Sequence, residues 1–159
     1  MIEAVALLLA VIAAWWVAST KRSKQGNRQA LDVLPKQFVV FDLETTGLHH
    51  EKHEIIEIGA IRVNRDSENH QTFQVLVKPT RKLPKRITEL TGISQEMLDA
   101  DGVNLAEALA EFRNFVGNHP LVAFNAEFDS AFIRSACTSV SADHFSNEIY
   151  CALDIARRA

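Results

Sequence analysis

The feature that most constrains this chain is the stretch FVVFDLETTG, residues 38–47, in which an apolar, strand-like run ends at two acids. Side chains alternate across a strand, so Asp42 and Glu44 are expected to point to the same side. Two carboxylates held that close repel each other unless a cation lies between them. Oxygen ligands suit Mg²⁺ or Mn²⁺ rather than zinc. The stretch therefore predicts a buried strand whose end binds a divalent cation, with an exposed strand end and solvated acids as the alternative.

The segments that follow indicate one α/β domain. Two further β-type runs, residues 54–63 and 72–79, come after short loops and predict an antiparallel meander with the first strand. The strongest helix is expected over residues 104–116, where Asn104 and Glu107 form a capping-box pattern ahead of an apolar stripe. Strand–helix alternation then predicts a mixed sheet. The remaining expected elements are short helices within 83–94 and 95–100, strands at 120–124 and 147–153, and helices at 126–137 and from 154 onward.

The N-terminus carries an uninterrupted apolar run at residues 4–18. A helix of about 18 residues reaches about 27 Å, close to the thickness of a bilayer core. Positive residues follow the run, whereas a cleaved signal peptide would place them before it. A signal peptide and a core helix are the alternatives. We expect a transmembrane anchor at 1–19, a basic linker at 20–36 and a domain at 37–159, with that domain on the cytoplasmic side of a bacterial-type inner membrane.

The net charge and the cysteine content indicate no particular function. The formal net charge of -3 makes no chain-wide case for nucleic-acid binding. Cys137 and Cys151 do not have the spacing of metal ligands, so we expect free, half-buried thiols.

A second acidic constellation is the stretch AFNAEFD, residues 123–129. A buried strand is expected to deliver Asn125 to the start of a helix and to place Asp129 in its first turn. The helix dipole stabilises a negative charge there, which would by itself explain the acid. Together with Asp42 and Glu44, however, Asp129 would bring three carboxylates to one end of a sheet. Two-metal hydrolysis of phosphodiesters requires such an arrangement.

Four segments, FDLETTG, IIEIGAIRV, ITELTGIS and LVAFNAEFDSAFI, occur in an order and spacing that resemble the DnaQ-like, or DEDD, 3′–5′ exonuclease family in its histidine branch. That family includes the proofreading epsilon subunit of bacterial DNA polymerase III, and the match covers residues 38–157. The resemblance implies a ribonuclease H-like mixed sheet with flanking helices and two divalent cations, Mg²⁺ or Mn²⁺. It also implies a single-stranded DNA or RNA 3′ end as substrate and, by resemblance alone, a polymerase subunit as partner.

The resemblance also assigns roles to residues. Asp42 would bridge both ions, Glu44 would hold the ion carrying the attacking water, and Asp129 would support the other ion. The residues that it places along the substrate are Thr45, Thr46, Leu48, Thr91, Gly92, Ile93, Asn125 and Phe128.

The family's third motif, His-x4-Asp or Tyr-x3-Asp, supplies a general base and a fourth carboxylate. The 159 residues hold no His-x4-Asp. Tyr150 and Asp154 have the spacing of the tyrosine form, but a strand-to-helix turn between them would separate the two side chains. We therefore expect a C-terminally incomplete domain with little or no nuclease activity. The alternative function is that of a catalytically inactive, membrane-tethered fragment that binds nucleic acid.

Overall fold

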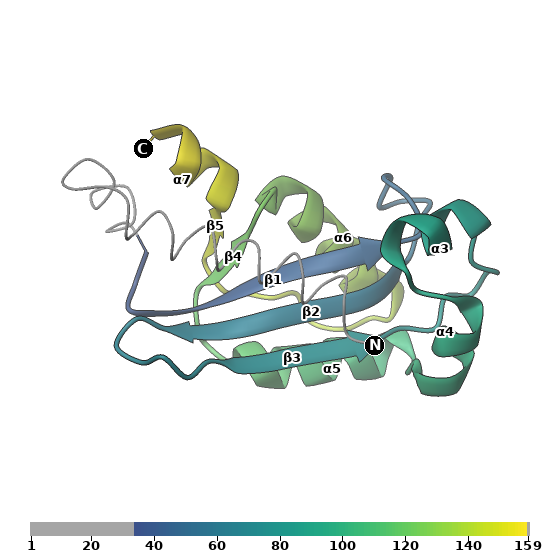
Figure 1. Ribbon diagram of the computed structural model, residues 1–159, viewed down its shortest axis with the longest axis horizontal. Coiled ribbons are helices and arrows are strands. Elements are labelled where there is room, and N and C mark those ends of the chain that lie inside the picture. Colours follow the sequence, from purple (N-terminus) through teal and green to yellow (C-terminus); the bar gives the residue numbers. More distant parts are fainter. Residues whose placement is uncertain (1–33, 159) are drawn as a thin grey trace.

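Strand β1, Gln37–Thr45, is the centre of a five-stranded sheet with the spatial order β3-β2-β1-β4-β5 (Figure 1). The structure is a computed structural model that describes residues 34–158. The chain continues from β1 into β2, Ile55–Asn64, and then into β3, Gln71–Leu76. Both pairings are antiparallel, which confirms the predicted meander.

The other side of β1 carries two short parallel strands. β4, Leu121–Ala123, pairs with β1 through Val39 and Val40 alone, and β5, Ile149–Cys151, pairs with β4. The sheet is therefore mixed, as the sequence predicts. Because β4 is only three residues long, the second half of β1 has no strand beside it on this side.

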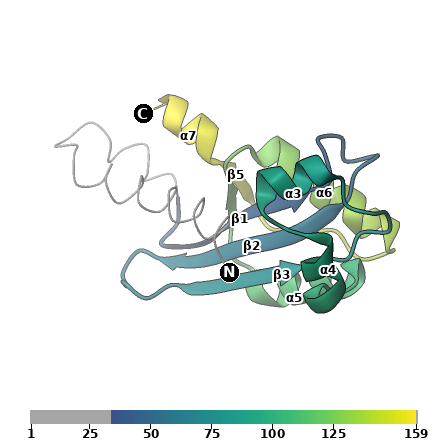
Figure 2. The ribbon, with the colours of Figure 1, turned by 45° about the vertical axis from the view of Figure 1, so that its right-hand side comes forward.

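Helices flank the sheet on several sides. Helices α5 and α6 pack on one face, while α3 and α4 lie at the end of the sheet where β1 finishes (Figures 1 and 2). The helices are α3 Lys85–Thr91, α4 Gln95–Asp101, α5 Leu105–Val116, α6 Ala126–Ser139 and α7 Ala152–Arg158.

The main core lies between the sheet and helices α5 and α6. The ring of Phe41 on β1 meets that of Phe112 on α5 at 5.5 Å between centroids, and Phe73 on β3 meets Phe112 at 5.8 Å. Each aromatic side chain buried in this way removes a large apolar area from water and so contributes strongly to folding. The core fixes this face of β1 inward and leaves Asp42 and Glu44 on the opposite face.

The helix caps follow the predicted chemistry. The Asn104 side chain accepts a hydrogen bond of 2.9 Å from the Glu107 N–H at the start of α5, and Gly117 ends that helix. At α4, the Ser94 hydroxyl accepts from the Met97 N–H at 3.2 Å. Both helix starts expected from sequence are thus confirmed.

Several details differ from the predictions. The third strand ends at Leu76 rather than at Pro79. Beyond it, the Val77 N–H still donates to the Ile56 carbonyl at 2.9 Å, but Val77 forms its bridge with Val103. Helix α7 begins at Ala152 rather than at Asp154. Cys137 is fully buried rather than half-buried, because α6 directs it into the main core, whereas Cys151 is half-buried; both thiols are free.

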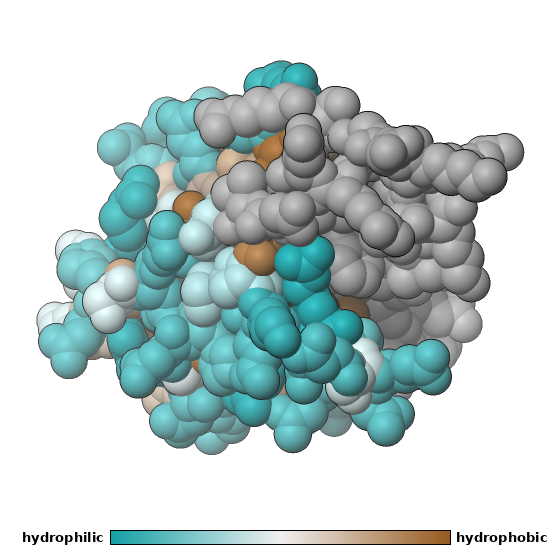
Figure 3. Space-filling view, turned by 90° about the vertical axis from the view of Figure 1, so that its left-hand side faces the viewer, coloured by the Kyte–Doolittle hydropathy of each residue, from teal (hydrophilic) through white to brown (hydrophobic). Residues whose placement is uncertain are grey.

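The predicted anchor, residues 1–19, and the predicted linker up to residue 33 lie outside the described residues. Within residues 34–158, no helix is both long and apolar enough to cross a membrane. The described surface at the end where β1 begins is mostly hydrophilic, with small apolar patches between polar side chains (Figure 3).

Candidate active site

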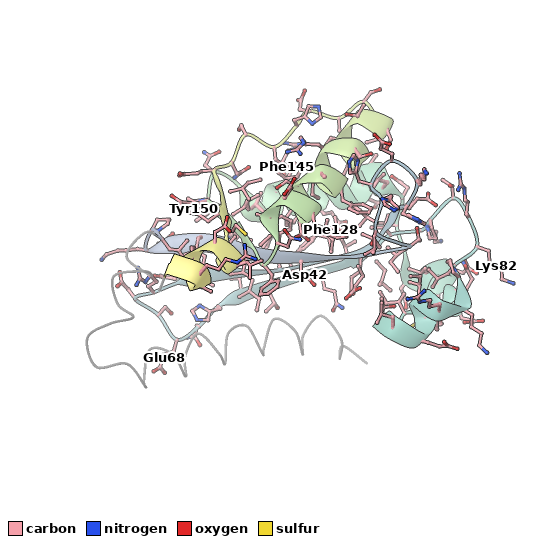
Figure 4. The ribbon with its side chains drawn as sticks, turned by 90° about the horizontal axis from the view of Figure 1, so that it is seen from above. Asp42, Glu68, Lys82, Phe128, Phe145 and Tyr150 are labelled. Carbon is pink, nitrogen blue, oxygen red and sulfur yellow. The ribbon has the colours of Figure 1, made fainter. Side chains whose placement is uncertain are left out.

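Asp42 and Glu44 lie on the face of β1 that is turned away from the main core, as the strand alternation predicts. Both are half-buried. Asp42 lies beside the start of α6, near Phe128 (Figure 4). The first motif therefore presents two acids on one face of the central strand, next to the element that carries the third acid.

Asp129 lies in the first turn of α6 and is 3% exposed. Its carboxyl and that of Asp42 both interact with the backbone N–H of Leu43. Alternate N–H groups of a strand point to the same side, and the Val39 N–H points toward β4, where it donates to Pro120 at 2.8 Å. The Leu43 N–H therefore points to the same side as the Val39 N–H. At Leu43, however, β4 has already ended, and the carboxyls of Asp42 and Asp129 lie near this N–H in place of a neighbouring strand.

The electrostatics of the three acids are those of a site without a counter-charge. Burial raises the pKa of Asp42 to about 6. Burial, with further repulsion from Asp42, raises the pKa of both Glu44 and Asp129 to about 7. Within residues 34–158, none of the three forms an ion pair. The three carboxyls therefore keep their protons to a higher pH than free carboxylic acids do, and Asp42 interacts with both of the others.

A fourth acid, Glu57 on β2, joins this group and was missed by the sequence reasoning. It is 3% exposed and stands opposite Glu44 in the register of β1 and β2. Burial raises its pKa, a hydrogen bond from the Gln74 side chain opposes the rise, and the charge of Asp42 adds to it. The signal in the sequence was an acid inside the otherwise apolar run IIEIGAI.

The donor chemistry of this group fits a divalent cation, although the side chains do not form a finished binding site. Within residues 34–158, no three histidine, cysteine, aspartate or glutamate side chains are arranged to hold a metal ion between them. The acids nevertheless offer only oxygen, the ligand that Mg²⁺ and Mn²⁺ prefer. Ionised acids without a counter-charge repel one another, and a cation would draw them together.

The turn after β1 is shaped by its two threonines. The Thr45 hydroxyl donates to the Gly47 carbonyl at 2.8 Å, and the Thr46 hydroxyl accepts from the Glu54 N–H at 3.0 Å. Thr45 and Thr46 were expected to lie along the substrate. In the structure their hydroxyls are used for hydrogen bonds that stabilise the turn. Leu48 follows the turn, and its side chain is 78% exposed.

The predicted second substrate loop is organised in the same way. Thr91 is buried, donates to the Ile87 carbonyl at 2.9 Å and accepts from the Ile93 N–H at 3.1 Å. Ile93 is buried in a small apolar cluster. Gly92 has a φ of 76° and open space where a Cβ would stand. Thr91 and Ile93 therefore support the loop, and any substrate contact here comes from the backbone at Gly92.

Side chains at the start of α6 and on α3 complete the rim. Asn125 is exposed and makes no capping bond, so its amide is open to solvent, while Phe128 packs against Phe132 with ring centroids 4.9 Å apart. Two further exposed apolar residues were not predicted, namely Leu90 at 77% and Phe124 at 54%. Only the three-dimensional structure reveals their exposure, because apolar residues on a short helix or at a strand end usually face a core.

The residues considered for a third motif have other partners. The Tyr150 hydroxyl interacts with Glu148, which raises the pKa of Tyr150. Asp154 pairs with Arg157 at 3.6 Å on α7. In the loop after β1, the rings of His49 and His53 stack at 6.4 Å.

Comparison with known proteins gives consistent results. The sequence pattern of the RNase_T family, described as Exonuclease, matches residues 39–159. The chain is 45% identical over 97 residues, 61% of its length, to the PolC-type DNA polymerase III of Thermotoga petrophila. It is 34% identical over 131 residues, 82% of its length, to the PolC-type DNA polymerase III of Halalkalibacterium halodurans. The fold is similar to E. coli exonuclease I in complex with a dT13 oligonucleotide, with a TM-score of 0.68 and 22% identity over 77% of this chain and 29% of that chain.

These similarities cover a small part of the larger relatives. The matched region makes up 7% of the Thermotoga petrophila protein and 9% of the Halalkalibacterium halodurans protein. They confirm the resemblance to DnaQ-like 3′–5′ exonucleases that the four sequence segments indicated, a family that generally uses divalent metal ions. With 121 of its 159 residues matched, the chain belongs to the RNase_T exonuclease family.

Proposed function

We propose that this domain is a metal-dependent 3′–5′ exonuclease that hydrolyses phosphodiester bonds at the 3′ end of a single strand. The observation that carries the proposal is the group formed by the buried acid Asp129 and the half-buried acids Asp42 and Glu44, which has no cationic partner within residues 34–158. Such a group is costly for folding and is accounted for by a bound cation.

The three acids have separate tasks in this proposal. Asp42 interacts electrostatically with both Glu44 and Asp129, and these three carboxylates would hold the divalent ions, Mg²⁺ or Mn²⁺. When bound, such ions neutralise the phosphate and activate water. Glu44 would hold the ion that carries the attacking water, Asp129 would support the other ion, and the backbone N–H of Leu43 favours the ionised form of Asp42 and of Asp129.

The rim around the acids fits a terminal nucleotide. Phe124 offers an exposed aromatic ring, on which a base can stack with little dependence on sequence, and Leu48 and Leu90 offer further exposed apolar surface. The Asn125 amide and the open backbone at Gly92 offer polar contacts. The bound oligonucleotide in the exonuclease I relative supports single-stranded DNA as the substrate.

A direct test is the hydrolysis of a 3′-labelled single strand in Mn²⁺ by the full chain. Because the 159 residues hold no His-x4-Asp, we expect the parent to release 3′-terminal nucleotides only slowly. Asp42→Ala should reduce this release at least 100-fold, or by about 3 kcal/mol in the barrier, and Asp66→Ala should leave it unchanged. Asp66 is an exposed acid in the β2–β3 turn and serves as the matched control. Binding of the strand without hydrolysis would instead favour a domain that binds nucleic-acid ends without cutting them.

We also propose that residues 1–19 anchor the protein in a membrane and that residues 20–36 link the anchor to the exonuclease domain, which then lies in the cytoplasm. The support is the order of an apolar run followed by positive residues. Membrane fractionation, with protease added from the outer side, tests this arrangement. Recovery of the chain in the supernatant would contradict it.

A polymerase is the proposed working partner. The support is that the PolC-type relatives are DNA polymerases in which the matched region is a small part. Chemical crosslinking of the full chain in cells, followed by identification of the crosslinked proteins, tests this partnership.

A further inference from the structure

A segment of strong positive charge is joined by hydrogen bonds to the turn that follows β1. We call residues 78–86 the basic segment; it contains Lys78, Arg81, Lys82, Lys85 and Arg86 and no acid. The whole chain carries -3 and this segment +5, so the rest of the chain carries -8. All five cationic residues are exposed. The charge of the basic segment is therefore opposite to that of the protein as a whole.

Acids of the protein neutralise little of this charge. Lys85 pairs with Glu89 at 3.8 Å, but both side chains are largely exposed, and such a pair is weak. Lys82 is close enough to help lower the pKa of Glu96. Within residues 34–158, Lys78, Arg81 and Arg86 form no ion pair. Most of the positive charge is thus available to an external anion.

The basic segment is fixed to the turn that borders the acids. The Thr80 N–H donates to the Glu54 side chain at 2.8 Å, and the Glu54 carbonyl accepts from the Thr46 N–H at 2.9 Å. On the other side, the Leu83 N–H donates to the Gln95 side chain at 2.8 Å. Lys82 points outward at one end of the molecule, while Asp42 lies inward on the sheet (Figure 4). The segment therefore extends outward from the site.

Helix α3 connects the basic segment to the exposed apolar side chain of Leu90. Arg86 and Leu90 are four residues apart on this helix, so their side chains lie on the same face. Both are exposed, and Leu90 precedes the loop at Gly92. A cation beside an exposed apolar side chain matches one phosphate beside one base, which is the repeating unit of a single strand.

We propose that the basic segment binds the phosphodiester backbone of a single strand at nucleotides on the 5′ side of the terminal nucleotide held at Asp42 and Glu44. The direction of the strand rests on the proposed function, whereas the binding itself does not. Anionic lipid headgroups are the other anionic surface that such a segment attracts. The hydrogen-bonded link from Thr80 through Glu54 to Thr46 favours the strand, because it fixes the basic segment to the turn that directly follows the strand carrying Asp42 and Glu44.

The test compares two double variants of the full chain in detergent. Lys82→Gln with Arg86→Gln removes two charges from the basic segment. Lys36→Gln with Arg157→Gln removes two charges from exposed pairs elsewhere and is the matched control. Binding of 5′-fluorescein oligo-dT of about 20 and of about 4 nucleotides is measured by anisotropy in EDTA, which prevents metal-dependent hydrolysis. Each lost phosphate contact on a single strand reduces the slope of log K against log salt by about 0.7.

For the basic-segment variant we expect Kd for the long strand to rise about 20-fold at about 100 mM salt, and the salt slope to fall by about 1.4. Kd for the short strand and both values for the control variant are expected to stay unchanged. If the variant lowers the thermal midpoint, Lys82→Gln with Lys85→Gln replaces it.

Several results would overturn the proposal: no binding of the long strand by the parent, equal losses for long and short strands, or equal losses in the control. A larger loss on phosphatidylglycerol vesicles than on the strand would assign the segment to lipid and overturn it too. A chain that binds as expected but hydrolyses nothing would refute the proposed exonuclease activity and leave this inference standing.

Discussion

Glu44 on β1 and Glu57 on β2 face each other directly across the antiparallel pair, on the face of the sheet that carries Asp42. Acids in directly opposite positions repel, and Glu57 is also almost completely buried. Only the Gln74 side chain, among the described residues, donates a side-chain hydrogen bond to Glu57. This pair of acids makes the sheet costly to fold without metal.

Replacing Glu57 with glutamine should therefore stabilise the metal-free protein. Glutamine keeps an oxygen for the Gln74 amide and removes the buried charge. We expect the free energy of unfolding to rise by about 1 kcal/mol at about pH 8 and to stay unchanged at about pH 4, where Glu57 is protonated. Urea unfolding in EDTA measures both values. Glu68→Gln, an exposed acid in the β2–β3 turn (Figure 4), is the control and should have no effect.

The stability of the metal-free protein should fall as pH rises. The pKa values of Asp42 and Glu44, raised from 3.8 and 4.5 to about 6 and about 7, mean that the fold retains protons that the unfolded chain has released. Stability is therefore full below about pH 4 and decreases through about pH 7. The shift of Asp42 alone corresponds to about 3 kcal/mol.

Thermal unfolding in EDTA between about pH 4 and pH 8 checks this prediction. Added Mg²⁺ should abolish the decrease, because the cation binds the ionised acids. A thermal unfolding midpoint that rises with pH in EDTA would contradict the prediction, because it would show that Asp42 and Glu44 stabilise the fold in their charged form.

Metal binding should depend on Asp42 and Asp129. In the parent, Mn²⁺ at about 100 times its dissociation constant should add about 2.7 kcal/mol to stability. Asp42→Asn and Asp129→Asn should each remove most of this gain and should be more stable than the parent in EDTA at neutral pH. Calorimetric titration with Mn²⁺ measures the affinity directly. If Asp66→Asn, which changes an exposed acid, lowered the Mn²⁺ affinity by the same factor, the ion would be binding nonspecifically.

The turn after β1 contains a close contact that a mutant cycle can measure. A Cβ at Gly47 would stand 2.6 Å from the His53 ring, whose Nδ1 is 3.4 Å from the Thr46 hydroxyl. Gly47→Ala should cost about 1–3 kcal/mol of stability because the ring must move. In the His53→Ala background the same change should cost less than about 0.5 kcal/mol. An equal loss of stability from Gly47→Ala in the parent and in the His53→Ala background would show that the His53 ring is not the cause of the loss.

The exposed leucines should affect substrate binding and not stability. Leu48→Ala and Leu90→Ala remove side chains that are 78% and 77% exposed, so the thermal midpoint should not change. Loss of apolar contact with a base should weaken strand binding by about 1 kcal/mol for each variant. Anisotropy with a short oligonucleotide in EDTA measures this change. Unchanged affinity in both variants would remove these leucines from the proposed substrate surface.

Much of the fold was predictable, because its signals are local. The apolar run that ends at Asp42, the capping pattern at Asn104 and Glu107, and the stripe on α5 depend on residues a few positions apart. Hydrophobic periodicity and caps report such neighbours reliably. Strand pairing followed from short connections and from the order of elements.

The rest of the site depends on neighbours that are distant in the sequence. Glu57 faces Glu44 only because the register of β1 and β2 aligns them, and no local pattern specifies that register. The Thr91 hydroxyl and the Ile93 side chain could not be assigned to the interior without knowing how α3 packs. Roles inferred from resemblance placed these residues near the substrate, and packing decided which of their atoms remain accessible.

The shortness of β4 has a further consequence. Had this strand continued past Ala123, it would have taken up the N–H of Leu43 as one more rung of the sheet, and Asp129 would have had no place beside Asp42. The acids thus occupy a gap where a neighbouring strand stops early. Insertions that extend β4 would add hydrogen bonds to the sheet and would remove the space that Asp129 occupies beside Asp42.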